Sequence, residues 1–509
     1  MNTQRPEWND ANNALVGKGL SVVTTCYLRR FVVFFQQIIE SDAAGFSISQ
    51  ELHRLFEATQ AVLLAAQTSS QPVSDEQRRE VLDALGKAGS AYRWQCYDNG
   101  CSNAQAHLSS DQLRGFLALV QDALDRTISA NRREDNLYHA YNTLHLGDGS
   151  AHVRHLYLML EGQVAVLSSG VLESEAVLEL LRQLRQSALY REDQHSYILY
   201  PDRDLPGFLE KNTFDETHTR DIELVQVLVD KGDVSLILKD MTGQYHFAGD
   251  LRNARGVSNV LQQLAKQPDL ADLVTKESAA VHRLFEQVFE HDRFTGRSGS
   301  FFAYEGLGSI YWHMVSKLLL AVQETIYRAS AANSETLPAL IEAYDDIRAG
   351  LGFNKSPDVY GAFPMDPYSH TPRDQGAKQP GMTGMVKEEI LTRLGELGIV
   401  IERGQIVFQP VLLRRVEFLQ APSVLAYCGV DDKRHELEVP AGALAFTLCR
   451  VPFVVQQADH NRFVVHRDDD TQQPVDGHRL DFALSQQIFA HAGGIRQINV
   501  YVNGSTVSQ

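Results

Sequence analysis

Apolar residues recur at three- and four-residue steps over most of the first 395 residues. After Ala11 this spacing runs through Leu20, Val23, Tyr27 and Phe31, and it is the spacing of one face of an α-helix. Comparable stretches lie at 50–67, 75–89, 110–130, 154–168, 174–188, 258–291, 308–329 and 335–350. Because no repeat of fixed period is visible, which disfavours a solenoid, the series predicts a helical bundle or a closed α/α toroid.

Two regions depart from the helical spacing. Residues 225–248 alternate between apolar and polar positions and contain glycine turns, which predicts a β-hairpin or a three-stranded insert. After Gly395 the chain consists of short β-rich runs separated by Gly, Pro, Asp and Asn, a pattern typical of a sandwich or jelly roll. We therefore expect a mainly helical domain over 1–395, with the insert near 225–248, and a small all-β domain over 396–509.

Charge and composition narrow the classes of partner. The 509 residues include 64 Asp and Glu against 47 Lys and Arg, a formal net charge of −17. This balance argues against nucleic acid and anionic membranes, which require a basic surface, and is compatible with neutral sugars. The N-terminus lacks a signal pattern and the apolar stretches are too short to span a bilayer, so we expect a cytoplasmic protein without a membrane partner.

Cysteine spacing and glycine motifs speak against a bound metal or an organic cofactor. The chain has five cysteines, and Cys96 and Cys101 lack the two-residue spacing of a zinc knuckle or a redox motif. No P-loop or dinucleotide fingerprint is present. We expect reduced thiols, no metal and no organic cofactor.

Three segments are unlike ordinary helix surface: 8–17, 294–314 and 354–389. Each combines aromatic residues, glycines, carboxylates or amides, and two of them carry histidine, near a predicted helix start. Aromatic rings stack on the faces of pyranose sugars, while Asp, Asn, Gln and His side chains bind hydroxyl groups. The three segments therefore indicate a sugar-binding site.

The same segments carry a resemblance to a known family. Trp8-Asn9-Asp10 resembles the tryptophan-asparagine-aspartate motif of the cellobiose/chitobiose phosphorylase family of glycoside hydrolases, and the run from Glu305 to His313 is similar to a later motif of that family. Met382-Thr383-Gly384 and the run 404–410 parallel its threonine-glycine-threonine helix and the strand that enters its β-domain. Ala11-Asn12 departs from the family pattern, and 90–255 has no counterpart in it.

The resemblance implies a fold and an expectation about the chain's extent. Members of the group form an (α/α) six-hairpin toroid followed by a β-domain. They carry a β-sandwich and several toroid helices before the tryptophan motif, whereas seven residues precede Trp8 here. The expectation is thus an incomplete toroid, the C-terminal portion of a longer enzyme.

The resemblance also assigns candidate roles to individual residues. Asp10 falls on the family's general acid; its alternative role is to cap a helix beginning near Ala11. If the reaction is hydrolysis, Glu305 is the candidate to activate water, with Asp366 behind it. If it is phosphorolysis, the candidate phosphate ligands are His313, Thr383 and the backbone near Gly384. Glu305 could instead form a structural ion pair, His313 could be a core residue, and Thr383 a helix cap.

Further residues are candidates for contact with the sugar. Trp8 and Asn9 flank Asp10, and Trp312 is a candidate stacking platform whose alternative place is the helical core. A proline-rich loop of more than 20 residues, a length typical of functional loops, adds five more. These are Tyr360, Asp366, Tyr368, His370 and Gln379.

Three functional hypotheses follow. The first is an enzyme that cleaves a β-linked oligosaccharide with inversion, by phosphorolysis or hydrolysis, with inorganic phosphate as the co-substrate in the former case. The second is a fragment or split-enzyme half, inactive alone, that binds a partner chain supplying the missing N-terminal portion or forms a homodimer because apolar helix faces are left open. The third, a helical scaffold for a peptide, leaves the three aromatic segments unexplained.

Overall fold

The computed structural model describes residues 14–39, 44–67, 72–296, 306–381 and 385–503. The chain divides into two units. Unit 1 comprises residues 1–162 and 198–309, and unit 2 comprises 163–197 and 310–509. Each unit is built from two stretches of chain, so the boundary between them does not fall at a single position.

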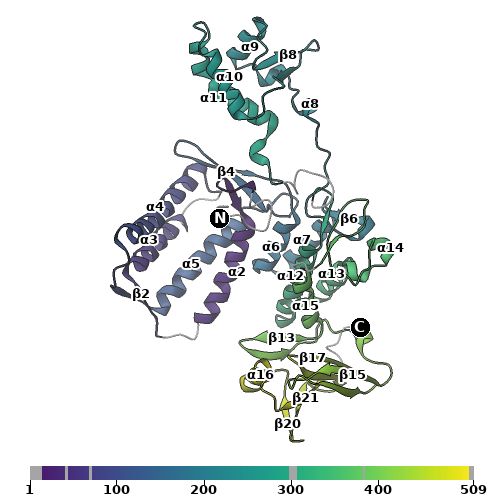
Figure 1. The fold of residues 1–509 in the computed structure, drawn as a ribbon. Coiled ribbons are helices and arrows are strands. Elements are labelled where there is room, and N and C mark those ends of the chain that lie inside the picture. The colour runs from purple at the N-terminus through teal and green to yellow at the C-terminus, as the bar shows by residue number, and fades with distance from the viewer. Residues whose placement is uncertain (1–13, 40–43, 68–71, 297–305, 382–384, 504–509) are drawn as a thin grey trace. The chain divides into compact units, whose positions relative to one another are not determined.

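The N-terminal part of unit 1 is a set of long helices with small antiparallel sheets (Figure 1). Ser74 and Ser109 begin two of the helices with complete capping boxes, which satisfy backbone N–H groups at the helix start. The helices are α2 (Val22–Ile39), α3 (Gln50–Gln67), α4 (Asp75–Asn99) and α5 (Ser110–Ser129). The strands are β1 (Gly19–Ser21), β2 (Phe46–Ser49), β3 (Gln105–Leu108), β4 (Tyr141–Leu146) and β5 (Ala151–His155), paired as β1-β4-β5 and β2-β3.

Helix α2 packs against α5 around Val32, Ile39, Leu117 and Leu124. Contrary to the expectation that the apolar stretches are too short to span a bilayer, α2, alone among the described helices, is long and apolar enough to cross a membrane by length and composition. A buried core helix passes the same test, so length and composition alone do not distinguish a core helix from a membrane-spanning helix.

Residues 205–292 of unit 1 form a module with its own core. Helices α9, α10 and α11 surround a hairpin, and the buried residues of this core all lie between Phe214 and Phe285. The elements are α8 (Phe208–Lys211), α9 (Glu223–Asp230), β8 (Ile237–Lys239), β9 (Tyr245–Phe247), α10 (Ala254–Leu264) and α11 (Ala271–Phe289).

The structure changes the secondary structure expected for 225–248. A two-stranded hairpin is present as β8-β9, but the first residues of the segment belong to helix α9. Leu224, Val225 and Leu228 are fully buried, and their spacing places them on one helical face. The apolar positions at the start of this segment, which we interpreted as strand alternation, therefore form one face of the short helix α9.

The helical part of unit 2 is centred on α12, which is buried along most of its length. It packs against α7, α13 and α15. A small sheet, β10-β11-β12, lies at the start of α12. The helices are α7 (Ser174–Gln186), α12 (Trp312–Ala331), α13 (Leu337–Ala349), α14 (Pro357–Tyr360) and α15 (Met385–Glu396); α6 (Leu160–Ser169) precedes α7. The strands are β6 (Tyr190–Arg191), β7 (Ser196–Tyr197), β10 (Ile310–Tyr311), β11 (Tyr368–Thr371) and β12 (Lys378–Pro380).

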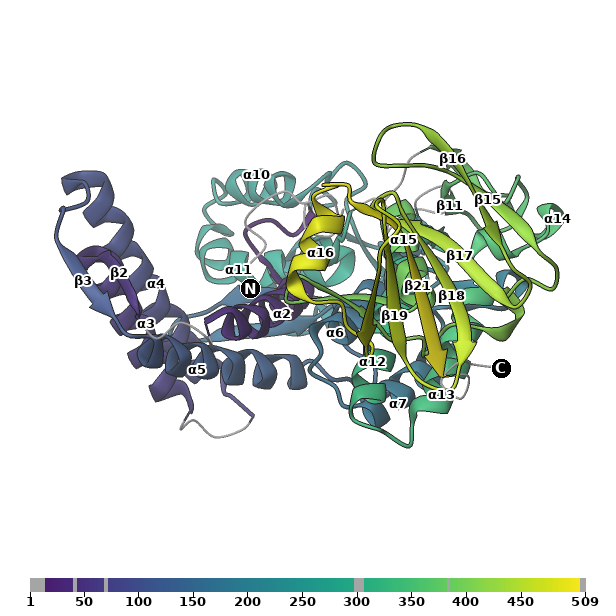
Figure 2. The ribbon, with the colours of Figure 1, turned by 90° about the horizontal axis from the view of Figure 1, so that it is seen from below.

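The C-terminal part of unit 2 is β-rich, as the sequence predicted. A five-stranded sheet has the order β17-β18-β21-β19-β20, with β18 and β21 parallel (Figure 2). Its strands are β17 (Ala443–Leu448), β18 (Val451–Ala458), β19 (Arg462–Arg467), β20 (Gln472–Asp476) and β21 (Ile495–Asn503). The pairs β13 (Ile399–Glu402) with β14 (Gln405–Phe408) and β15 (Ser423–Cys428) with β16 (Arg434–Val439) precede it.

This region also contains an α-helix. Helix α16 (Phe482–Phe489) begins at Asp481, whose side chain accepts a hydrogen bond from the backbone N–H of Leu484. It buries Leu484 and Ile488 in the β-region's core. A helical part followed by a β-rich C-terminal region is thus established, and closure of the helices into a toroid stays a prediction.

Candidate functional site

The small sheet of unit 2 places two predicted site segments beside each other. Strand β10 pairs antiparallel with β11, so Tyr311 lies opposite His370. Helix α12 begins directly after β10 and puts His313 in its first turn. Helix α15 begins at Met385 and puts Glu388 in its own first turn. Residues 57 positions apart along the sequence (370 − 313) are thereby brought to one site.

Four side chains form a continuous row, here named the His313 cluster: Tyr311, His313, His370 and Glu388. The rings of His370 and Tyr311 stack with centroids 4.9 Å apart. The Tyr311 hydroxyl lies 3.3 Å from His313 Nδ1, and His313 Nε2 lies 3.3 Å from Glu388 Oε1. With a proton on Nε2 directed at the carboxylate, Nδ1 of a neutral ring is left to accept the tyrosine O–H.

The electrostatics of the cluster favour a charged carboxylate and a neutral second imidazole. Burial raises the pKa of Glu388, but the hydrogen bond and charge of His313 outweigh it, and the pKa is lowered overall. Burial lowers the pKa of His370 to about 4, against the opposing effect of its hydrogen bond to Gln379. At neutral pH Glu388 is therefore ionised and His370 is uncharged. Within the described ranges, Glu388 Oε2 is buried and lacks a hydrogen-bond partner.

Two of the predicted sugar contacts are core residues in the structure. Trp312 is fully buried, and its indole N–H donates a 2.9 Å hydrogen bond to Thr371 Oγ1. Tyr360 is 1% exposed and meets the Trp312 ring edge-on, at a centroid distance of 5.6 Å. The ammonium group of Lys355 lies 5.1 Å from the centre of the same indole. Neither aromatic ring offers an open face to a sugar in this structure.

The other predicted residues of the loop lie nearer the surface. Tyr368 is half-buried and packs edge-on against Tyr360, while Asp366 and Gln379 are exposed. Six further candidates lie outside the residues that the structure describes: Trp8, Asn9, Asp10, Glu305, Thr383 and Gly384. Their roles remain predictions.

Sequence reasoning missed two members of the His313 cluster. Tyr311 precedes His313 by two residues, and at the end of a strand its hydroxyl turns back toward the imidazole. Glu388 belongs to the run Lys387-Glu388-Glu389, which has the composition of a solvated helix face. Its position one turn into a helix that follows Thr383-Gly384 was the only signal in the sequence.

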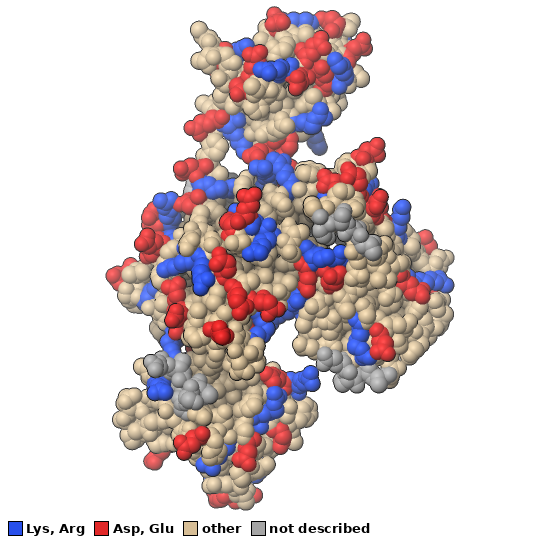
Figure 3. Space-filling model, turned by 180° about the vertical axis from the view of Figure 1, so that it is seen from behind, with Lys and Arg blue, Asp and Glu red and all other residues tan. Residues whose placement is uncertain are grey.

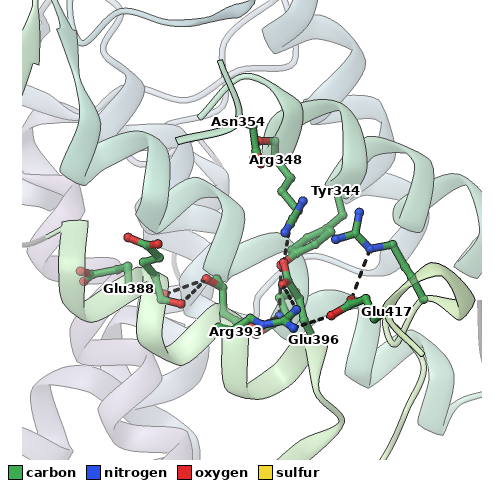
Figure 4. Close-up of polar contacts among 11 residues, drawn as sticks. Tyr344, Arg348, Asn354, Glu388, Arg393, Glu396 and Glu417 are labelled. Atoms are coloured by element: carbon green, nitrogen blue, oxygen red, sulfur yellow. Dashed lines mark hydrogen bonds and ion pairs between the residues drawn. The ribbon is translucent and has the colours of Figure 1, made fainter. Parts of the chain in front are cut away.

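The far end of α15 is fixed by a buried network of charged residues (Figure 4). Glu396 is 4% exposed and accepts hydrogen bonds from Tyr344 (2.9 Å), Arg348 (2.7 Å) and Arg393 (2.9 Å). Arg393 also donates to Glu417, beyond the helix. The network joins α13 to α15 and so fixes the helix that presents Glu388.

The module of unit 1 connects the chain to a known family. Residues 205–292 match the family model of the GH149 phosphorylase insertion domain 2. The matched residues are those of the separately cored module, and part of them lies in the stretch 90–255 that had no counterpart in the family named from the sequence. No curated protein matches the chain.

The match supports a carbohydrate-active enzyme of the glycoside phosphorylase-like kind. It does not single out the cellobiose/chitobiose group. On the face drawn in Figure 3, acidic and basic side chains are interspersed, without a broad basic patch. A neutral sugar is compatible with such a surface.

Proposed function

We propose that this chain is the catalytic part of an inverting glycoside phosphorylase that acts on β-linked oligosaccharides, built on an (α/α) six-hairpin toroid. The observation that carries the proposal is the His313 cluster, in which the imidazole at the start of α12 is oriented by the half-buried carboxylate at the start of α15. The match of 205–292 to a phosphorylase insertion domain supports the same class of enzyme.

In the proposed reaction, Asp10 gives its proton to the glycosidic oxygen as the bond to the anomeric carbon breaks. Phosphate attacks that carbon from the opposite face, which inverts its configuration and yields a sugar 1-phosphate and a shortened sugar. A general acid of this kind needs a carboxyl that stays protonated near neutral pH. The resemblance of the Trp8-Asn9-Asp10 motif supports this role.

The phosphate is assigned to His313, Thr383 and the backbone at Gly384. Glu388 accepts a hydrogen bond from His313 Nε2 and so orients the ring, which leaves Nδ1 as the acceptor. Phosphate then displaces the Tyr311 hydroxyl from Nδ1: a P–O–H group of the phosphate donates to Nδ1, and another phosphate oxygen accepts from the tyrosine O–H. A hydrogen bond from a hydroxyl to a charged phosphate oxygen is among the stronger ones, so the contact with Tyr311 favours an anionic co-substrate.

Hydrolysis is the competing reaction, and phosphate dependence separates the two. The purified chain is incubated with β-linked disaccharides and longer oligosaccharides, with and without phosphate. Sugar 1-phosphate of inverted configuration, formed only with phosphate, supports the proposal. Reducing sugar released equally without phosphate would instead assign Glu305, with Asp366 behind it, to the activation of water.

A second candidate, the inactive half of a split enzyme, is favoured by one observation. Helix α2 exposes Phe31, Phe34 and Ile38 to between 53% and 57%, at steps of three and four residues. An apolar helix face of this kind is typical of a surface that another chain covers. A folded chain that yields no product, and that sediments as a dimer or requires a second chain for activity, would support this candidate over the first.

A further inference from the structure

Two cysteines of unit 1 meet at the surface, although their spacing in the sequence matches no redox motif. Cys96 lies in the last turn of α4, and Cys101 follows the end of that helix. Their sulfur atoms are 3.7 Å apart, with the Cys101 thiol donating to Cys96. Cys101 is exposed and Cys96 is half-buried, so small thiol reagents have access to the pair.

The backbone between the two cysteines explains why their sulfur atoms meet. Gly100 caps α4 with a φ of 69°, a conformation that glycine adopts readily. This residue reverses the chain and returns Cys101 toward the last turn of the helix. The next residue is anchored, because the Ser102 N–H donates a 2.9 Å hydrogen bond to Glu51 and its hydroxyl donates to the same oxygen.

Glu51 is itself in the first turn of α3. The segment after α4 is therefore tied to the neighbouring helix, and the approach of the two sulfurs does not depend on a free loop. The surroundings also affect the chemistry of the pair. The hydrogen bond and the charge of Cys96, with smaller effects of burial and of Glu51, raise the pKa of Cys101, which slows its spontaneous reaction as a thiolate.

We propose that Cys96 and Cys101 are a reversible oxidation site that closes to an intramolecular disulfide in exchange with a small disulfide such as oxidised glutathione. One sulfur of the pair attacks glutathione disulfide, releases one glutathione thiol and forms a mixed disulfide. The neighbouring sulfur then displaces the second glutathione. Two protein S–H groups are lost, one S–S bond forms, and one glutathione disulfide is reduced to two thiols.

The remaining cysteine of unit 1 provides a contrast. Cys26 is fully buried in α2, and burial raises its pKa to about 12. It has neither the access nor the ionisation that exchange requires. We expect it to stay reduced under conditions in which Cys96 and Cys101 are oxidised.

Trypsin cleavage after Arg93 and Arg114 releases both cysteines in one peptide, 94–114, which makes the test direct. The full chain is equilibrated in buffers of increasing oxidised-to-reduced glutathione ratio, quenched in acid, alkylated and digested. We expect this peptide to lose both alkyl groups together and to appear about 2 Da lighter than the unalkylated reduced form. Reduction with dithiothreitol should restore two alkylation sites.

Two variants complete the test. Cys101→Ser should stop at a glutathione adduct on Cys96, because no neighbouring thiol is left to displace it, whereas Cys428→Ser should leave the behaviour of peptide 94–114 unchanged. Two alkyl groups retained at every glutathione ratio would overturn the proposal. So would a wild-type chain that accumulates the glutathione adduct without closing the disulfide.

Discussion

His313 and Glu388 lie 3.3 Å apart, Nε2 to Oε1, in the first turns of two different helices. Each helix begins within one of the segments that the sequence indicated as parts of a sugar-binding site, 294–314 and 354–389. Neither segment identifies the pair alone, because the partners come together only through the packing of α12 on α15. The contact gives the proposed phosphate ligand a fixed orientation.

Replacing the carboxylate of this pair should weaken phosphate binding more than it slows the chemical step. We expect Glu388→Gln to raise the KM for phosphate about 10- to 100-fold, the scale found when a group that orients a ligand is removed, with a smaller change in kcat. Steady-state kinetics at varied phosphate measure the split. Glu389→Gln, on the same helix turn, is the matched control, and an equal effect in both variants would contradict the role of Glu388.

Removing the proposed general acid should abolish turnover without unfolding the protein. We expect Asp10→Asn to reduce kcat by at least ~100-fold, the contribution typical of general acid catalysis, while the urea unfolding midpoint stays close to that of the wild type. A substrate with an activated leaving group, which needs little protonation, should recover part of the activity. Unchanged turnover on an ordinary β-linked disaccharide would end the assignment.

The end of α11 carries a carboxyl group that should make stability depend on pH. Burial and a hydrogen bond with Asp292 raise the pKa of Glu286 from 4.5 to about 7. The folded state then binds a proton that the unfolded state releases, so this group's contribution to stability is lost as pH rises from about 4.5 to about 7. Burial lowers the pKa of His291, which acts in the opposite direction in the same range.

The difference between wild type and Glu286→Gln isolates the contribution of Glu286. We expect the free energy of unfolding of the variant, relative to the wild type, to rise as the pH increases from 5 to about 7. Urea unfolding at several pH values measures it. The lowered pKa of Asp292 acts below this range, and a difference that does not change with pH would contradict the prediction.

The network around Glu396 should be sensitive to loss of its central charge. Glu396→Gln leaves Arg348 and Arg393 without their shared buried carboxylate, and we expect a cost of about 3 kcal/mol in the free energy of unfolding. Tyr344→Phe removes one hydrogen bond to Glu396 and should cost about 1 kcal/mol. Chemical denaturation ranks the two variants, and an equal cost would show that the charge itself is not stabilising.

The sequence predicted the elements with strong local signals. Helices begin directly after Ser74 and Ser109, where the predicted helical stretches 75–89 and 110–130 start, and the β-rich runs after Gly395 form strands. The helix α9 was missed because eight residues carry too few turns to separate helical spacing from alternation. The remaining elements depend on packing between residues far apart in the sequence, which local patterns do not reveal.

Trp312 and Tyr360 illustrate why the candidate site could be predicted only in part from the sequence. Their composition fits a sugar-binding surface, yet Thr371 takes the indole hydrogen bond and the two rings close on each other. Whether an aromatic ring faces solvent depends on elements far away in the sequence. Glu388 could not be identified from the sequence for the same reason: its neighbours along the chain are typical of a helix surface, and its contact with His313 comes from the packing of α12 on α15.

The core of residues 205–292 is formed by apolar side chains of that stretch alone, so the stretch is a self-contained structural module. Its sequence can drift, or be exchanged for a shorter linker, without opening a void in the cores of the remaining helices. Substitutions in residues 205–292 are thus selected independently of substitutions that affect the proposed reaction. We expect differences between related enzymes in assembly or substrate length to accumulate there first.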